Sequence, residues 1–328
     1  MRILVTGGGG FIGSNFLYYL KGAHPDYEIR CLDLLTYAGH IESIRPLIDQ
    51  KYVTFIKGDI RKSTDVSRAM KDADAVVHLA AESHVDRSIH DAFPFIETNV
   101  KGTMCLLEEA RRNDIGRFHH VSTDEVFGSL DINSSDKFSE KSCYSPRSPY
   151  AASKAASDHL VRAYANTYGL RTTISNCGNN FGPYQHPEKL IPRFITLLLA
   201  GRKVPLYGDG LNIRDWIYVE DHCSAIDTVM RNGRSGETYL VSGRNEISNR
   251  ALTEKLLSLM GHGSSMIERV ADRPGHDRKY SIDDSKLRNE LGWKPRHSLD
   301  TSLKETIDWY REHRNWWQPL AENVPPQF

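Results

Sequence analysis

The stretch TGGGGFIGS, residues 6–14, decides the fold. It places Gly7, Gly10 and Gly13 at intervals of three, between the short apolar run that opens the chain and an amphipathic helical pattern. Glycines at these positions allow a tight turn between strand and helix, and they let backbone N–H groups approach a pyrophosphate at the helix N-terminus. A flexible turn would carry the same glycines, so the surrounding chain has to decide between the two interpretations.

Five further segments of apolar and β-branched residues are typical of strands. They are YEIRCLDLL (27–35), YVTFIKGDI (52–60), ADAVVHLAAES (73–83), RFHHVSTDEVFG (117–128) and TTISNCGNNFG (172–182). Helical patterns near Asn99–Arg112 and over Tyr150–Tyr168 alternate with them. This alternation predicts an α/β fold with a Rossmann-type doubly wound parallel sheet.

Beyond residue 180 the regular alternation of strand and helix patterns stops, because prolines at 183, 187, 192 and 205 interrupt short strands and helices. We therefore expect an NAD-binding Rossmann domain over residues 1–180. Residues 181–328 would form a smaller mixed α/β substrate-binding lobe, with some of its segments crossing back to the first domain.

Asp33 supports dinucleotide binding and predicts which dinucleotide is bound. It lies 20 residues beyond Gly13, at the end of the second predicted strand. A carboxylate there can accept hydrogen bonds from the adenosine ribose and would repel a 2′-phosphate. The sequence therefore favours NAD over NADP.

Composition excludes several other classes of protein. Lys+Arg and Asp+Glu both number 42 in 328 residues, which argues against a nucleic-acid partner. No apolar run is long enough to span a bilayer, so no membrane partner is expected. The five cysteines contain no CxxC pair and the histidines have no metal-ligand spacing, so we expect reduced thiols, no metal and a cytoplasmic location.

Two groups of residues suggest chemistry. Tyr150 and Lys154 are one helical turn apart, where an ammonium can lower the pKa of the phenol and make it a usable base. Thr123, Asp124 and Glu125 follow the fifth predicted strand, whose carboxyl end faces the cofactor crevice. Two neighbouring carboxyl groups there can supply a general acid and a general base, although a solvated turn could also contain them.

The glycine spacing and the Tyr150-Lys154 pair resemble the extended short-chain dehydrogenase/reductase superfamily. STDEVFG (122–128) resembles the signature of the nucleotide-sugar 4,6-dehydratases, above all those acting on dTDP-glucose. The resemblance covers nearly the whole chain, including HLAAESHVDRSI (78–89), SPYAASKAASDHL (148–160), NNFGPYQHPEKLIPRF (179–194), LYGDGLNIRDWIYVEDH (206–222) and DRPGHDRKYSID (272–283). On these motifs the chain is identified as a member of that family.

The resemblance implies a reaction. Tyr150, with Thr123, would take the proton of the glucose 4-hydroxyl while NAD+ accepts hydride from C4. Glu125 would remove the C5 proton, Asp124 would protonate the departing 6-hydroxyl, and hydride would return to C6. The implied substrate is dTDP-glucose, the implied product is a 4-keto-6-deoxyglucose nucleotide, and NAD would stay bound through each cycle.

The resemblance also implies binding residues at matched positions. Cofactor contacts would come from Gly7, Gly10, Phe11, Ile12, Gly13, Asp33, Leu34, Thr36, Asp59, Ile60, Leu79, Ala80, Ala81, Ser83, Thr98, Tyr150, Lys154 and Asn180. Substrate contacts would come from Ser83, Thr123, Asp124, Glu125, Asn179, Glu188, Lys189, Leu190, Pro205, Leu206, Tyr207, Arg214, Asn249, Arg273 and His276. The related proteins form homodimers, so a homodimer is expected.

Several alternatives stay open at this stage. A UDP-glucose 4,6-dehydratase would differ only in the nucleotide, because thymine and uracil differ by one methyl group. A UDP-sugar 4-epimerase shares the glycine motif and YxxxK but needs no acid to expel the 6-hydroxyl, so Asp124 and Glu125 count against it. A UDP-glucuronate decarboxylase generally has Ser at the position of Asp124. A non-catalytic NAD-binding regulator would not need the intact catalytic set. Phe127 and Asn176 depart from the family pattern, which usually has Tyr and Arg there.

Overall fold

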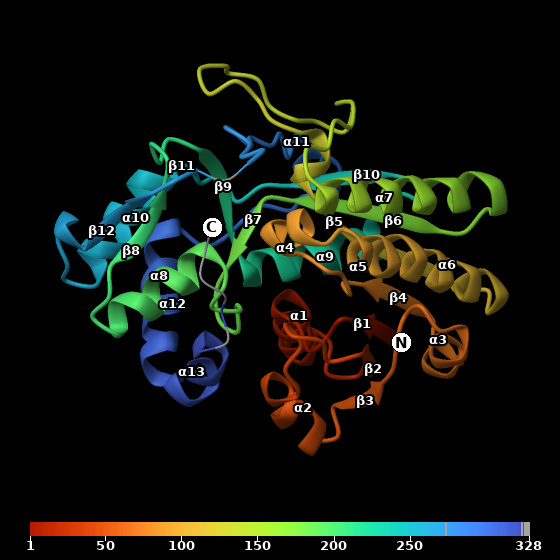
Figure 1. Ribbon diagram of the computed structural model, residues 1–328. Helices are drawn as coiled ribbons and strands as arrows, with labels where there is room; N and C mark the ends of the chain where they lie inside the picture. The colour runs from red at the N-terminus through yellow and green to blue at the C-terminus, as the bar shows by residue number, and fades with distance from the viewer. Residues whose placement is uncertain (273, 323, 325–328) are drawn as a thin grey trace.

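A seven-stranded parallel sheet is the centre of the structure, a computed structural model that describes residues 1–272, 274–322 and 324 (Figure 1). Its strand order is β10-β6-β5-β4-β1-β2-β3. The strands are β1 (Arg2–Thr6), β2 (Glu28–Asp33), β3 (Val53–Lys57), β4 (Ala75–His78), β5 (Arg117–Thr123), β6 (Thr172–Cys177) and β10 (Thr238–Val241). The order reverses between β1 and β4, and a crevice at such a switch point is where open α/β sheets bind ligands.

Helices cover both faces of this sheet because neighbouring strand residues point to opposite sides. Ile3 and Val5 pack with the helices on one face, while Leu4 packs with those on the other. The first face carries α1 (Phe11–Ala23), α2 (Arg45–Asp49) and α9 (Val219–Asn232), and the second carries α3 (Ser63–Met70), α6 (Thr103–Arg112) and α7 (Pro149–Tyr168). The predicted doubly wound α/β fold is thereby confirmed.

Two predicted elements are corrected by the structure. The segment TTISNCGNNFG does not form one strand, because β6 ends at Cys177 and Asn179–Phe181 pairs in another sheet as β7. Gly178 lies between them, where a Cβ atom would stand 2.6 Å from the carbonyl oxygen of Asp215. The predicted helix near Asn99–Arg112 begins earlier, as the π-helical segment η2 (Ile96–Gly102) that runs into α6.

The remaining elements form a second lobe around two small sheets (left in Figure 1). One sheet contains β7, β9 (Ile213–Tyr218) and β11 (Glu246–Ser248), and the other contains β8 (Val204–Tyr207) and β12 (Ile267–Val270). The helices of this lobe are α8 (Leu190–Leu199), α10 (Asn249–Leu259), α12 (Leu299–Glu312) and α13 (Arg314–Glu322). Short elements complete the fold, namely η1 (Ile41–Ser43), α4 (Val85–His90), α5 (Phe93–Phe95), η3 (Asp124–Phe127), η4 (Ser264–Met266) and α11 (Ser285–Leu291).

The division at residue 180 stays a prediction. The structure adds that α9, β10 and α11 lie after that residue but belong to the central sheet and its covering helices. Within the described ranges, no helix combines the length and the apolarity needed to cross a membrane.

Candidate active site

The glycine turn after β1 is shaped by close backbone contacts. Gly7 has φ +76°, and a Cβ atom on it would lie 2.6 Å from the backbone of Ala80. A Cβ on Gly13 would lie 2.1 Å from the carbonyl oxygen of Gly7, so only glycine lets α1 start this close to the turn. No side chain caps α1 at Gly10, and the first N–H groups of a helix have no carbonyl partner within it. This arrangement fits the pyrophosphate of a dinucleotide.

Asp33 stands at the end of β2, beside the glycine turn. Its carboxylate accepts hydrogen bonds from the N–H of Gly9 at 2.8 Å and from the N–H of Leu35 at 2.7 Å. Burial raises the pKa of Asp33, and these two N–H groups oppose the rise. The carboxylate is therefore fixed in place with acceptor capacity left over, which fits a ribose hydroxyl pair.

A cavity of about 300 Å³, called the central cavity below, runs from the glycine turn to the end of β5. Every residue assigned above to the cofactor lines it, as do the five proposed catalytic residues and Ser83, Asn179, Glu188 and Lys189 from the substrate set. It is also lined by residues that the sequence did not single out, including Arg61, Glu82, Gln185 and His186. Arg61 forms an ion pair with Asp59 at 2.7 Å. The sequence feature that could have identified Arg61 as a cavity residue is its position directly after Ile60, a predicted cofactor residue.

The end of β5 places Thr123, Asp124 and Glu125 at the cavity. Thr123 caps η3, where its hydroxyl oxygen accepts from the N–H of Glu125 at 3.3 Å. The same hydroxyl donates to Asp124 Oδ1 at 3.3 Å. Asp124 is 2% exposed, and its pKa is raised well above the usual value, first by burial and then by the negative charges of Glu125 and Asp215. A buried, protonated Asp124 can act as an acid.

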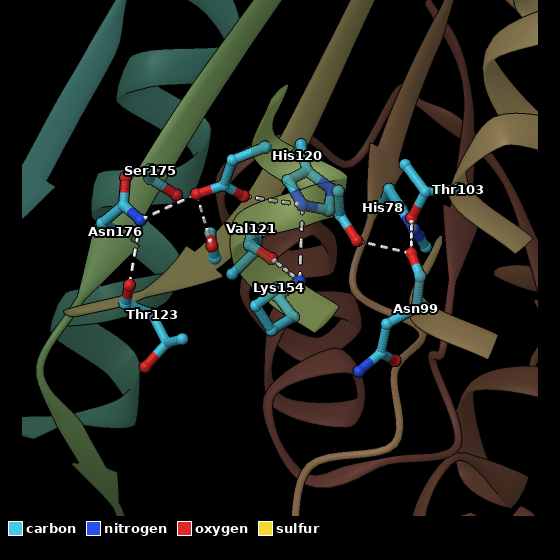
Figure 2. Close-up of polar contacts among 12 residues, drawn as sticks. His78, Asn99, Thr103, His120, Val121, Thr123, Lys154, Ser175 and Asn176 are labelled. Atoms are coloured by element: carbon cyan, nitrogen blue, oxygen red, sulfur yellow. Dashed lines mark hydrogen bonds and ion pairs between the residues drawn. The ribbon is translucent and has the colours of Figure 1, made fainter. Parts of the chain in front are cut away.

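The first turn of α7 supplies Tyr150 and Lys154. Ser148 caps this helix by accepting from the N–H of Ala151 at 3.1 Å, and Pro149 occupies its first turn. Lys154 Nζ donates to the carbonyl oxygen of Val121 at 2.9 Å, as Figure 2 shows. Both side chains are buried, so their charged forms are stabilised only by neighbouring groups.

The ionisation of Tyr150 differs from the expectation drawn from the sequence. Burial raises the pKa of Tyr150 well above its usual value, the charge of Glu125 raises it further, and a hydrogen bond with Thr123 opposes the rise. Burial also lowers the pKa of Lys154 to about 8, which Asp158 opposes.

The substrate residues divide into two groups. Glu188 lines the central cavity, where its carboxylate accepts from Tyr37 at 3.0 Å and from Arg87 at 3.2 Å. The residues outside the lining of this cavity are Leu190, Pro205, Leu206, Tyr207, Arg214, Asn249 and His276, and Arg273 lies outside the described residues.

Residues of the second group contact neighbouring parts of the protein. The Arg214 guanidinium donates to the carbonyl oxygens of Ile213 and Asp277 at 2.8 Å each. His276 lies 2.6 Å from Asp272 and edge-on to the ring of Tyr207. The assignments of Arg214, His276 and Tyr207 to the substrate therefore stay predictions. Among the described residues, no group of three or more His, Cys, Asp or Glu side chains could hold a metal ion.

The chain is similar to known proteins along nearly its whole length. A family model described as GDP-mannose 4,6 dehydratase matches residues 4–306. The dTDP-glucose 4,6-dehydratase of Mycobacterium tuberculosis (strain CDC 1551 / Oshkosh) is 49% identical over 329 residues, covering 100% of this chain and 98% of that protein.

Solved structures give the same result. DesIV, a dTDP-glucose 4,6-dehydratase from Streptomyces venezuelae with NAD bound, is 52% identical with a TM-score of 0.95, covering 98% of this chain and 100% of that one. The UDP-glucose 4-epimerase of Thermus thermophilus, a complex with NAD, is 29% identical with a TM-score of 0.87, covering 95% and 100%. On the family match and the near-complete alignment with the dehydratases, this chain belongs to the nucleotide-sugar 4,6-dehydratase family.

Proposed function

We propose that this chain is a dTDP-glucose 4,6-dehydratase, a hydro-lyase that converts dTDP-glucose to dTDP-4-keto-6-deoxyglucose and water with tightly bound NAD. The observation that carries the proposal is that Thr123, Asp124 and Glu125 line the same cavity as Tyr150 and the glycine turn. An acid and a base therefore stand next to a dinucleotide site, which is what an elimination of water requires.

The surroundings of each residue determine its role in the reaction. Tyr150, assisted by the Thr123 hydroxyl, takes the proton of the 4-hydroxyl group. Bound NAD supplies the hydride chemistry, accepting hydride from C4 and returning it to C6. Glu125, less buried than Asp124, takes the C5 proton that the 4-keto group has acidified. Asp124, whose pKa is raised mainly by burial, gives its proton to the departing 6-hydroxyl.

The test is the mass of the product formed in D2O from dTDP-glucose, with no added cofactor. Loss of one water with uptake of one deuterium at C5 is the expected result. A product with unchanged mass and inverted C4 would instead identify an epimerase, the activity of the Thermus thermophilus relative. Turnover without added NAD would support a tightly bound cofactor. A requirement for added NAD would contradict the claim that NAD stays bound.

The base of the nucleotide is tested separately, with UDP-glucose assayed in parallel. The relatives at about half identity are named for dTDP-glucose, which supports thymidine as the nucleoside. A pocket gains only about 1–3 kcal/mol from one methyl group, so we expect a preference of roughly tenfold or more rather than an absolute one. Faster turnover of UDP-glucose would overturn the assignment.

The proposal includes a homodimer built on α6 and α7, which lie side by side (Figure 1). Apolar side chains on and before these helices are exposed in the single chain: Phe93 is 82% exposed, and Ile96, Met104 and Tyr168 are about half exposed. A second copy of this surface would cover them. Sedimentation should give a dimer for the native protein and a monomer for Phe93→Glu. A monomeric native protein would contradict this.

A cytoplasmic location is also proposed. All five cysteines are free, which suits a reducing compartment. Fractionation of the native cells should place the protein with cytoplasmic enzymes, and recovery from an oxidising compartment would contradict the proposal.

A further inference from the structure

A buried carboxylate lies behind the catalytic residues and has no part in the reaction above. It belongs to Asp158 on α7, which is 0% exposed. Asp158 Oδ2 accepts from Ser122 Oγ at 3.0 Å, from Tyr144 at 2.7 Å and from Asn176 Nδ2 at 3.2 Å. Burial opposes ionisation, but His120, the Lys154 ammonium and the Tyr144 hydroxyl hold the pKa of Asp158 below its usual value. The group is therefore a stable buried anion.

Asp158 Oδ1 reaches toward Lys154 through His120. This oxygen lies 3.2 Å from His120 Nε2, and Lys154 Nζ lies 3.4 Å from the same nitrogen. The approach of His120 to Asp158 is within ion-pair distance but lacks hydrogen-bond geometry. Lys154 is held by the Val121 carbonyl beside this contact, as Figure 2 shows for the labelled residues.

Asp158 is the carboxylate that opposes the effect of burial on the pKa of Lys154. The other titratable groups around Lys154 are His78 on β4, His120 on β5, Cys177 on β6, Tyr150 and Arg162 on α7, and the carboxyls of Asp124 and Glu125 at the cavity. Burial lowers the pKa of His78 and lowers that of His120 to about 4, while it raises that of Cys177 to about 12, so all three are neutral near pH 7. Arg162 is a cation and cannot stabilise an ammonium. The charge that favours protonated Lys154 is that of Asp158.

The second oxygen of Asp158 connects to Thr123. Asn176 Nδ2 donates both to Asp158 Oδ2 and to the carbonyl oxygen of Thr123, the latter at 2.9 Å. Figure 2 shows Asn176 on the strand beside Thr123. The Asp158 carboxylate thus holds the Asn176 amide, and this amide holds the end of β5 at Thr123. Asp158 is therefore a buried anchor for both Lys154 and Thr123.

We propose that Asp158 is a positioning residue of this active site: its carboxylate is the buried counter-ion of Lys154 and, through Asn176, the anchor of the Thr123 backbone. This inference rests on the proposed dehydratase function. It goes beyond packing because it predicts a specific change in ionisation when the charge is removed and the shape is kept.

The test compares Asp158→Asn with Asp158→Glu in the holoenzyme, using pH profiles of kcat for dTDP-glucose. Without the anion, Lys154 loses its proton at lower pH, so the alkaline limb of the Asp158→Asn profile should move down by about one pH unit. We expect kcat near neutral pH to fall about ten- to a hundredfold, with KM little changed. Asp158→Glu keeps the charge and should keep the position of the limb.

A second measurement needs no substrate, so its failure is distinct from failure of the proposed function. The side-chain ammonium of Lys154 is titrated by ¹⁵N NMR in the holoenzyme, and the spectrum of Lys154→Met is subtracted to isolate its signal. In Asp158→Asn, Lys154 should lose its proton at lower pH than in the native protein, because the anion that opposes the effect of burial is gone. An unchanged Lys154 titration in folded Asp158→Asn would overturn the inference, whatever the substrate proves to be.

Three controls keep the result specific. Asp227 on α9 is also a buried carboxylate, and it lies 3.0 Å from His24. Asp227→Asn makes the same chemical change there, and it should leave the pH profile of kcat and the titration curve unchanged. His120→Gln keeps an amide donor for Asp158, so a limb that moves in this variant would assign the titration to His120 and overturn the role of Asp158.

If Asp158→Asn does not fold, Asn176→Leu tests the other connection, from Asp158 through Asn176 to Thr123. It should lower kcat without moving the alkaline limb, and a native kcat would refute the anchor.

Discussion

The carboxyl groups of Asp124 and Glu125 are neighbours in the chain, yet their surroundings differ. Asp124 is buried and Glu125 is only partly so, and after burial the largest influence on the pKa of Asp124 is the negative charge of Glu125. Like charges this close do not ionise together, so the more buried group keeps the proton. One pair of adjacent residues thereby supplies both an acid and a base.

Replacing Asp124 by Asn should separate the steps of the reaction. The amide cannot protonate the 6-hydroxyl, so we expect loss of water to slow about a hundredfold or more, while oxidation at C4 changes much less. In single-turnover absorbance traces, NADH should then accumulate. Equal slowing of NADH formation and product formation would contradict the separate roles of the two carboxyl groups.

Tyr150→Phe should abolish every step, because no base remains for the 4-hydroxyl proton. Neither NADH nor product should appear with the dTDP-glucose assay. Tyr164→Phe is the matched control, since Tyr164 is a buried tyrosine on the same helix with its hydroxyl bonded to Glu108. Appreciable turnover by Tyr150→Phe would remove this residue from its role.

Asp33→Asn should weaken the choice between dinucleotides. Loss of the negative charge removes repulsion of a 2′-phosphate, so the ratio of the Kd values for NADP and NAD should fall at least about tenfold. Gly9 and Leu35 donate to different oxygens of Asp33, so Asn keeps the acceptor for one of these two N–H groups and preserves part of the support of the turn. Calorimetric titration of the two cofactors measures the ratio, and an unchanged ratio would show that Asp33 does not select the cofactor.

The pH dependence of stability should follow the buried histidines. Burial lowers the pKa of His119 to about 3, of His120 to about 4 and of His222 to about 3, against 6.5 as the ordinary value. The unfolded chain therefore binds more protons below pH 6.5, and the free energy of unfolding falls as the pH drops from about 6.5 toward 4.

His119→Gln tests this. Between pH 7 and pH 5, the variant should lose less stability than the native protein by about 1–2 kcal/mol, as measured by urea unfolding. The exposed His313→Gln should show the native loss. If His119→Gln also retains the full native loss, other groups control the acid sensitivity.

The sequence was sufficient for features that depend on local pattern. The glycine turn, Asp33 at the end of β2 and the position of Thr123 at the end of β5 are all set by strand and turn residues close in the chain. Gly7, Asp33 and Leu79 line one cavity because they lie at or directly after the carboxyl ends of parallel strands.

Features that depend on distant contacts could not be predicted. Gly178 follows the end of β6 at a point where the carbonyl oxygen of Asp215, far along the chain, leaves no room for a Cβ atom. The pKa of Tyr150 is raised by its burial and by the charge of Glu125, and neither follows from the spacing of four residues. Asp158 looks like an ordinary helical residue until His120, Ser122 and Asn176 are brought to it by two strands.

The position of β10 has a consequence for synthesis of the protein. This strand covers β6 at the edge of the central sheet but is encoded at residues 238–241, after β7, α8, β8 and β9 of the second lobe. A growing chain therefore exposes the unpaired backbone groups of β6 until β10 has left the ribosome, and such an edge can pair with other chains. Slow elongation or truncation before residue 238 should make the nascent protein prone to aggregation and dependent on chaperones.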